Sequence, residues 1–216
     1  HAVYWAALGL QKARENPTRI KEDDLITLRR VIYQSMLLSF HRGRLILNPF
    51  AQAYEFGPNL AIIPKVNFAY EQAAEEDQQN REHIKKAHRN FLRDAVYFLY
   101  TYNRLADAAH WYKYLSTQYP NKPLLEGKPD SLPATLTLDQ YAVARVQEDV
   151  SDSGGRDRTQ GIVDGLLVSS YRSLALGEDG PAAGFRLLAQ RVWEAYQSQM
   201  PKQRLAAIGL RPFAET

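Results

Sequence analysis

The sequence predicts an all-α fold: an irregular array of antiparallel helix pairs joined by long, proline-rich connections. Apolar residues recur at helical spacing, most regularly in the run Leu25, Leu28, Ile32, Met36 and Phe40. Alternation typical of strands is scarce, and no glycine-rich phosphate loop follows a strand. The chain has 216 residues, 45% of them hydrophobic and 24% charged, which is enough to bury a sizeable core in one helical domain.

Two helices are expected near the start of the chain. The first covers Ala2 to Arg14 and ends at Asn16-Pro17. The second begins at Lys21 to Asp24, where carboxylates suit the positive end of a helix, and continues from Leu25 to Phe40. Because the apolar residues of this second helix occupy more than one face, we expect it to be central.

The segment after Gly43 is predicted to be a long irregular loop, because Pro49, Pro58 and Pro64 interrupt it. Its apolar content favours a loop that packs against the helices. Helix is expected to resume after Pro64, a favourable first-turn residue, and either to break or to bend in the polar stretch 75–80. The apolar residues of the predicted loop after Gly43 are Ile46, Phe50, Tyr54, Phe56 and Ile62.

The second half is predicted to contain further helix pairs. One pair covers Arg81 to Tyr102 and Leu105 to Tyr119, with Asn103-Arg104 at the turn. After a proline-rich linker, Thr137 is expected to cap a helix from Leu138 to Val150. A break at 151–157 precedes a last pair at 160–176 and 181–200. The predicted single domain 1–216 therefore has four parts: helices with a packed loop (1–80), a central pair (81–121), a linker (122–136) and C-terminal helices (137–216).

Composition excludes some classes of protein and leaves others open. The net charge of +3 and the pI near 9.0 are too modest to favour a nucleic-acid partner. Cysteine is absent, which rules out disulfides and thiolate sites but does not fix the compartment. No apolar run approaches the roughly 18 residues that span a bilayer. Since the sequence begins at His1 in what resembles a helix, we expect it to be part of a longer chain or a processed product, with any targeting signal outside it.

Histidines and carboxylates form no recognisable reactive set. His83 and His88 are five residues apart, about 140° around a helix, and cannot share a metal ion well. Acidic pairs such as Asp23-Asp24 are typical of solvated faces and helix starts. We therefore expect no metal, no cofactor and no catalytic residue.

The aromatic stretch from Tyr102 to Asn121 permits two interpretations. Ala108 and Leu115, with Trp111 and Tyr112 between them, form one apolar stripe that favours helix packing. The alternative is a ligand site that includes His110. We favour packing.

Spacing in this region carries a family resemblance. Ala108, Tyr112 and Pro120 are a small residue, an aromatic residue four positions later and a proline eight positions after that. With Asn103 at the turn, the stretch 89–121 resembles a tetratricopeptide (TPR) repeat, a helix pair of about 34 residues. Val96 and Leu115 stand where the family prefers small residues. A weaker match covers 163–196 and rests on Ser170, Gly177, Ala182 and Ala189.

The resemblance implies a concave groove lined by the first helix of the pair. Cationic residues also recur every four positions along that helix, from Arg81 to Arg93, and so share one face. That face predicts either an anionic partner or a solvated surface that pairs with Glu82. The candidate partner-binding residues are Lys85, Arg89, Arg93, Tyr97, Tyr100 and Thr101.

These patterns predict a non-catalytic interaction or assembly module. Its partner would be a peptide or protein subunit bound in a TPR-like groove, or neighbouring repeats of the same longer chain. The alternative is an all-α enzyme that acts on an anionic polymer such as a polysaccharide. In that case His41, Arg42 and Arg44, just before the long loop, would line an anionic cleft.

Overall fold

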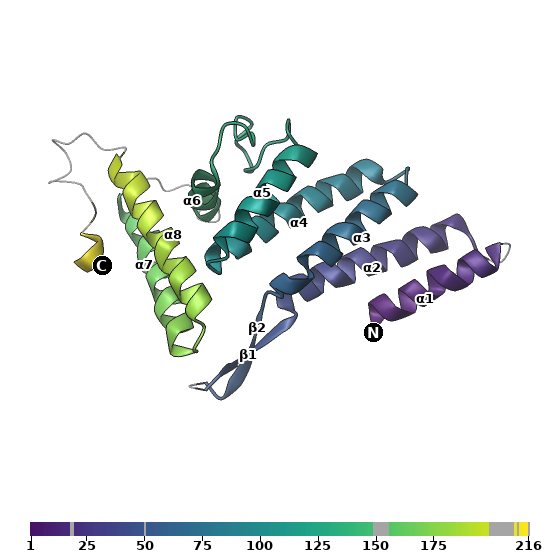
Figure 1. The fold of residues 1–216 in the computed structure, drawn as a ribbon, viewed down its shortest axis with the longest axis horizontal. Helices are drawn as coiled ribbons and strands as arrows, with labels where there is room; N and C mark the ends of the chain where they lie inside the picture. The colour runs from purple at the N-terminus through teal and green to yellow at the C-terminus, as the bar shows by residue number, and fades with distance from the viewer. Residues whose placement is uncertain (18–19, 50, 149–155, 199–209, 211, 216) are drawn as a thin grey trace. The chain divides into compact units, whose positions relative to one another are not determined.

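The computed structural model describes residues 1–17, 20–49, 51–148, 156–198, 210 and 212–215. Within these ranges the chain forms eight α-helices and one two-stranded hairpin (Figure 1), which confirms the predicted mostly helical class. Its contacts divide it into two compact units, His1–Ala95 and Val96–Thr216. The boundary falls inside one continuous helix, α4 (Arg81–Thr101). That residues 1–216 form a single helical-repeat domain stays a prediction.

The helices of the first unit follow the expected order. They are α1 (Ala2–Glu15), α2 (Glu22–Arg42), α3 (Ile63–Glu76) and the first part of α4. α1 lies along α2, and α2 packs on α3 (Figure 1). Their bounds agree closely with the apolar periodicity, because that periodicity is what buries one face of each helix.

Aromatic rings fill the core between α2, α3 and α4. Tyr70 of α3 lies 4.9 Å from the ring of Tyr33 and 5.7 Å from that of Phe91. Phe40, at the end of α2, meets Phe91 edge-on at 5.3 Å. His88 stacks on Tyr70 at 5.5 Å and is buried with it. The central position predicted for α2 matches this packing.

The segment after α2 is not the irregular packed loop that the prolines suggested. It is an antiparallel hairpin, β1 (Arg44–Asn48) and β2 (Ala53–Gly57), followed by a short 3-10 helix at Leu60–Ile62. The prolines lie outside the paired residues, so they do not interrupt the ladder. The prediction that its apolar side chains pack down was also wrong for Tyr54 and Phe56, which are exposed. Phe50 lies outside the described residues.

The second unit contains the end of α4 and four more helices. These are α5 (Leu105–Gln118), α6 (Leu138–Glu148), α7 (Arg156–Ala175) and α8 (Asp179–Ser198). α7 and α8 lie side by side as a helical hairpin (Figure 1). The predicted break at 151–157 falls mostly on residues outside the described ranges, as do Val150 and Met200.

The turn between α4 and α5 has the predicted conformation. Asn103 is left-handed, with φ of 57°. Its N–H donates to the Tyr100 carbonyl at 3.0 Å, and the Arg104 N–H donates to the Leu99 carbonyl at 2.8 Å. These two bonds form a Schellman cap. Asparagine tolerates that backbone, so the helix ends here without glycine.

The predicted cap of α6 is also present. The Gln140 N–H donates to Thr137 Oγ1 at 3.2 Å, and the Thr137 N–H donates to Gln140 Oε1 at 2.9 Å. This reciprocal pair is a capping box, which satisfies N–H groups that lack a partner within the helix. The linker before it is packed rather than loose, because Leu124 and Leu125 are buried.

Small residues mark the places where helices approach closely. Ser170 of α7 donates from Oγ to the Ala182 carbonyl of α8 at 2.7 Å, and both residues are buried. Gly184 of α8 lies against the end of α4: an added Cβ would collide with the Thr101 carbonyl and come within 2.8 Å of the Asn103 nitrogen. Ser170 and Ala182, two residues of the weaker repeat match, therefore lie at a helix contact, and the repeat itself stays a prediction.

Candidate functional site

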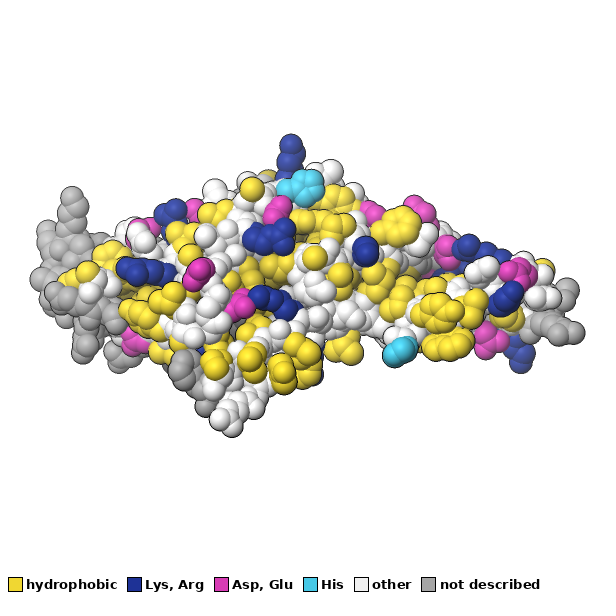
Figure 2. All heavy atoms as spheres, turned by 60° about the horizontal axis from the view of Figure 1, so that its bottom comes forward, with side chains coloured by type: hydrophobic (Ala, Val, Ile, Leu, Met, Phe, Trp, Pro, Cys, Tyr) yellow, Lys and Arg dark blue, Asp and Glu magenta, His cyan; other side chains and the backbone are white. Residues whose placement is uncertain are grey.

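The hairpin presents two apolar cross-strand pairs on one face. Leu45 lies opposite Phe56, and Leu47 lies opposite Tyr54. Their exposed fractions are 62%, 68%, 56% and 69% in that order. Monomeric proteins rarely leave neighbouring large apolar side chains this open unless another surface covers them. In Figure 2, hydrophobic side chains (yellow) are visible on the face that looks toward the viewer.

Local hydrogen bonds hold the hairpin in this register. Asn48 Nδ2 donates to Glu55 Oε1 at 2.6 Å, and the Ala51 N–H donates to Asn48 Oδ1 at 3.0 Å. Gln52 is left-handed, with φ of 50°, which turns the chain back into β2. Because Ile46, Asn48 and Glu55 form the half-buried opposite face, the register sends the Leu45–Phe56 and Leu47–Tyr54 pairs outward.

The predicted anionic cleft is not assembled as one cluster. Arg42 and Arg44 are exposed at the base of the hairpin. His41 is half-buried instead, with Nε2 3.7 Å from Asp94 Oδ2 and its ring 4.9 Å from that of Phe40. The two arginines therefore flank the apolar hairpin, while His41 belongs to the packing of α2.

The candidate groove residues on α4 range from open to buried. Lys85 is half-exposed and lies 3.6 Å from Glu82, as the solvated alternative predicted. Arg93, Tyr100 and Thr101 are only 5%, 1% and 1% exposed. These three side chains are therefore largely closed to solvent within the chain, and the groove assignment stays a prediction. Arg89 and Tyr97 are half-buried.

The aromatic stretch of α5 behaves as helix packing. Ala108 and Leu115 are fully buried. Tyr112 donates from its hydroxyl to the Leu136 carbonyl at 2.6 Å, and burial raises its pKa to about 12. Trp111 is half-buried and meets Tyr114 edge-on at 5.4 Å, while His110 is exposed. The two hollows described below are lined by other side chains.

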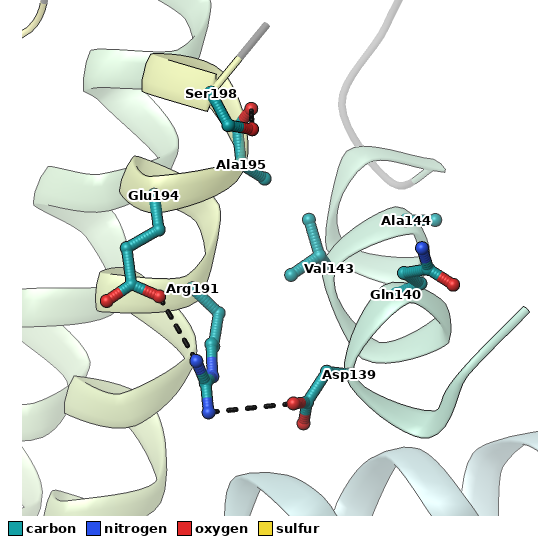
Figure 3. A pocket seen from close by; sticks show the side chains of 8 residues that line it. All are labelled: Asp139, Gln140, Val143, Ala144, Arg191, Glu194, Ala195 and Ser198. Carbon is teal, nitrogen blue, oxygen red and sulfur yellow. Dashed lines mark hydrogen bonds and ion pairs between the residues drawn. The ribbon is translucent and has the colours of Figure 1, made fainter.

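A groove of about 410 Å³ lies between α6 and α8. Figure 3 shows Asp139 on α6 facing Arg191 and Glu194 on α8, with small apolar side chains farther along. Arg191 Nη2 is 3.6 Å from Asp139 Oδ2, and Nη1 is 3.1 Å from Glu194 Oε2. The full lining consists of Asp139, Gln140, Val143, Ala144, Arg191, Glu194, Ala195 and Ser198.

Electrostatics in this groove favour structure over acid–base chemistry. Tyr100 donates from its hydroxyl to Asp139 Oδ1 at 2.7 Å. Burial and that hydrogen bond raise the pKa of Tyr100, so its hydroxyl stays protonated at neutral pH. The Asp139 carboxylate raises the pKa of Arg191, which stays charged. The three groups thus link α4, α6 and α8 as a fixed polar network.

A smaller hollow of about 210 Å³ lies in the first unit beside α1 and α2. At the edge of this hollow, the Glu76 carboxylate accepts hydrogen bonds from Arg29 Nε at 2.6 Å and from Arg14 Nη2 at 3.4 Å. Both arginines therefore engage one carboxylate. Among the described residues no group of three His, Asp or Glu side chains could hold a metal ion, and no helix there is long and apolar enough to cross a bilayer.

Sequence reasoning missed the hairpin surface, although a signal was present. Leu45 to Leu47 and Tyr54 to Phe56 are two short β-favouring runs separated by a turn rich in polar and small residues. The Asp139–Arg191 pair had no such signal, because 52 positions separate two ordinary charged residues in the numbering.

Comparison with known proteins returned no match. Neither the family models, nor the curated proteins, nor the solved structures contain one that matches this chain.

Proposed function

We propose that this chain is a non-catalytic protein-interaction module and that its β1–β2 hairpin is the surface that docks a partner. The observation that carries the proposal is the outward face of the hairpin, with two cross-strand pairs of large apolar residues more than half exposed. A two-stranded ribbon has no second sheet to cover such a face. Burying it against another protein would remove that apolar surface from water.

The charge around the hairpin indicates the chemistry of the partner. Between Gln34 and Tyr70 the ionised side chains are Arg42, Arg44, Lys65 and a single carboxylate, Glu55. This stretch carries a net positive charge. The exposed cations therefore favour a partner segment in which carboxylates alternate with apolar residues, because complementary charge speeds docking and orients the partner.

An extended segment suits this surface better than a helix. Alternate residues of a strand point to the same side, so a strand added at the edge of the hairpin could place apolar side chains beside the Leu45–Phe56 and Leu47–Tyr54 pairs. The edges of a two-stranded ribbon also offer backbone groups to such a strand. The proposed partner is therefore a protein segment bound by strand addition.

The TPR-like groove and the packing against neighbouring repeats stay predictions. If the chain does belong to a longer solenoid, the hairpin is an insertion at the end of a helix pair, where repeat proteins carry binding loops. No observation on the described residues favours the polysaccharide-enzyme alternative, since the two hollows are lined by residues other than His41, Arg42 and Arg44.

The test uses a short peptide in which glutamate alternates with valine, titrated into the isotope-labelled chain and followed by NMR. Amide signals of β1 and β2 should shift. The double variant Leu47→Ser with Tyr54→Ser should weaken peptide binding at least about tenfold, the loss of a central contact pair. Its thermal unfolding should stay unchanged, because both side chains are exposed.

Tyr4→Ser is the matched control, since Tyr4 is 64% exposed in the same unit but lies on α1. It should bind the peptide as the unchanged chain does. A second arm replaces the peptide with vesicles of phosphatidylcholine and phosphatidylserine. Hairpin-dependent binding to vesicles without peptide binding would replace the protein partner by a membrane surface. Peptide binding that ignores the double variant would exclude the hairpin.

A further inference from the structure

α7 carries an uncovered apolar face in the second unit. Its buried side packs on α8 and includes Val163 and Ser170. On the other side Val168 and Tyr171 are 65% and 62% exposed. Val168 and Tyr171 are three positions apart, which places them on neighbouring turns of one face. A surface helix normally shows polar residues on its outer side.

Two glycines widen this face. Gly161 and Gly165 are exposed, and an added Cβ on either would meet nothing within 4 Å. Each costs about 1 kcal/mol of helix stability relative to alanine. Gly184 on α8 has a reason within the chain, the close approach of Thr101. Gly161 and Gly165 have no such reason, and a flat strip of this kind lets a second helix come near.

Charges on the same face are arranged symmetrically about Val168. Asp164 lies four positions before it and Arg172 four positions after it, and both are exposed. Gly165 and Tyr171 lie three positions before and after. Asp164 accepts a hydrogen bond from Gln160 at 2.7 Å, which orients its carboxylate along the helix surface. The face is therefore complementary to itself when one copy is reversed.

We propose that this face of α7 is a self-association surface that binds α7 of a second copy of the chain, antiparallel, with a twofold axis at Val168. The reversal brings Asp164 of each copy level with Arg172 of the other. It also sets Tyr171 of each copy level with Gly165, so that a large ring lies over a residue without a side chain. A twofold contact uses the same patch on both subunits, as this one would.

A parallel pairing is disfavoured by the same residues. It would put Asp164 beside Asp164 and Arg172 beside Arg172, and like charges across a contact are repulsive. It would also put Tyr171 against Tyr171 and leave the glycines facing each other. The proposal is independent of the hairpin, which belongs to the other unit and is tested with different variants.

Orientation can be tested by single cysteines, because the chain has none of its own. Val168→Cys should give a disulfide-linked dimer under mild oxidation, since the two copies of position 168 meet at the axis. Gly161→Cys is the matched control on the same face. In the antiparallel pair its two copies are about 21 Å apart along the helix axis, 14 residues of rise, and should stay unlinked. Equal linking at both positions would overturn the antiparallel arrangement.

Charge reversal tests the contact itself by sedimentation equilibrium of the whole chain. Asp164→Arg and Arg172→Asp should each weaken self-association at least about tenfold, and the double variant should restore it to within about threefold. A merely structural role would not produce that rescue. A chain that remains monomeric at submillimolar concentration, or a double variant as weak as the single ones, would refute the proposal.

Discussion

His88 is the buried residue whose chemistry responds most directly to pH. Its Nε2–H donates to Asn67 Oδ1 at 2.7 Å, and burial lowers its pKa to about 4 from an ordinary 6.5. Tyr70 and Phe91 stack on the ring. The imidazole is therefore neutral in the folded protein at physiological pH, and it serves the core rather than a reaction.

This pKa predicts acid sensitivity. Between pH 6.5 and 4 the unfolded chain binds a proton at His88 that the folded chain does not, so stability is full above pH 6.5 and falls with acidification. At pH 5 the loss should be about 2 kcal/mol relative to pH 7.5, at about 1.4 kcal/mol per pKa unit. Urea unfolding at the two pH values measures it. His88→Gln should abolish this component, whereas His83→Gln, at an exposed position, should leave it intact. An equal loss in His88→Gln would assign the acid sensitivity elsewhere.

The Tyr100 side chain also makes a testable contribution to the stability of the folded chain. Its hydroxyl reaches Asp139 from a fully buried ring. Tyr100→Phe keeps the ring and removes the hydrogen bond, which should cost about 1 kcal/mol of unfolding free energy. The same substitution should make the salt dependence of stability larger, because Asp139 then depends on Arg191 alone. Denaturant titrations at low and high salt would show it, and an unchanged midpoint would mean that water replaces the hydroxyl.

At the scale of the helices, replacing glycine by alanine should have opposite effects on stability at Gly184 and at Gly161. Gly184→Ala forces a Cβ into the Thr101 carbonyl between α8 and α4 and should destabilise the chain by about 3 kcal/mol. Gly161→Ala meets open space on α7 and should stabilise the helix by about 0.5 to 1 kcal/mol. Thermal unfolding at low protein concentration, where self-association is negligible, compares them. Matching effects at both positions would contradict the close α4–α8 contact.

Helix bounds and caps were largely predictable, whereas the hairpin was not. The Schellman turn at Asn103 and the capping box at Thr137 depend on residues within a few positions of each other, so local sequence suffices to predict them. The hairpin depends on pairing between β1 and β2 in one register, and prolines outside the ladder disguised it. Predicting strands from short apolar runs is ambiguous for that reason.

Across the whole chain, the two compact units predict unequal resistance to acid. The His88 cluster lies in His1–Ala95, while the α7–α8 hairpin lies in Val96–Thr216. Hydrogen exchange at pH 5 should therefore show amides of α2 and α3 losing protection before those of α7 and α8. At pH 7.5 this difference should shrink. Simultaneous loss in all four helices would mean that the units unfold as one.

The all-α class and the helix order follow from local patterns in the chain. Periodicity, caps and turn residues act over a few positions, and each confines the backbone whatever surrounds it. Tertiary contacts decided that side chains of α4 are buried. They also decided that one apolar face of the hairpin and one of α7 are exposed. Arg93 and Tyr100 resemble surface residues in sequence, yet both are buried, whereas Leu45 and Val168 resemble core residues and are exposed. Burial depends on which elements lie against a face, and residues distant in sequence supply those elements.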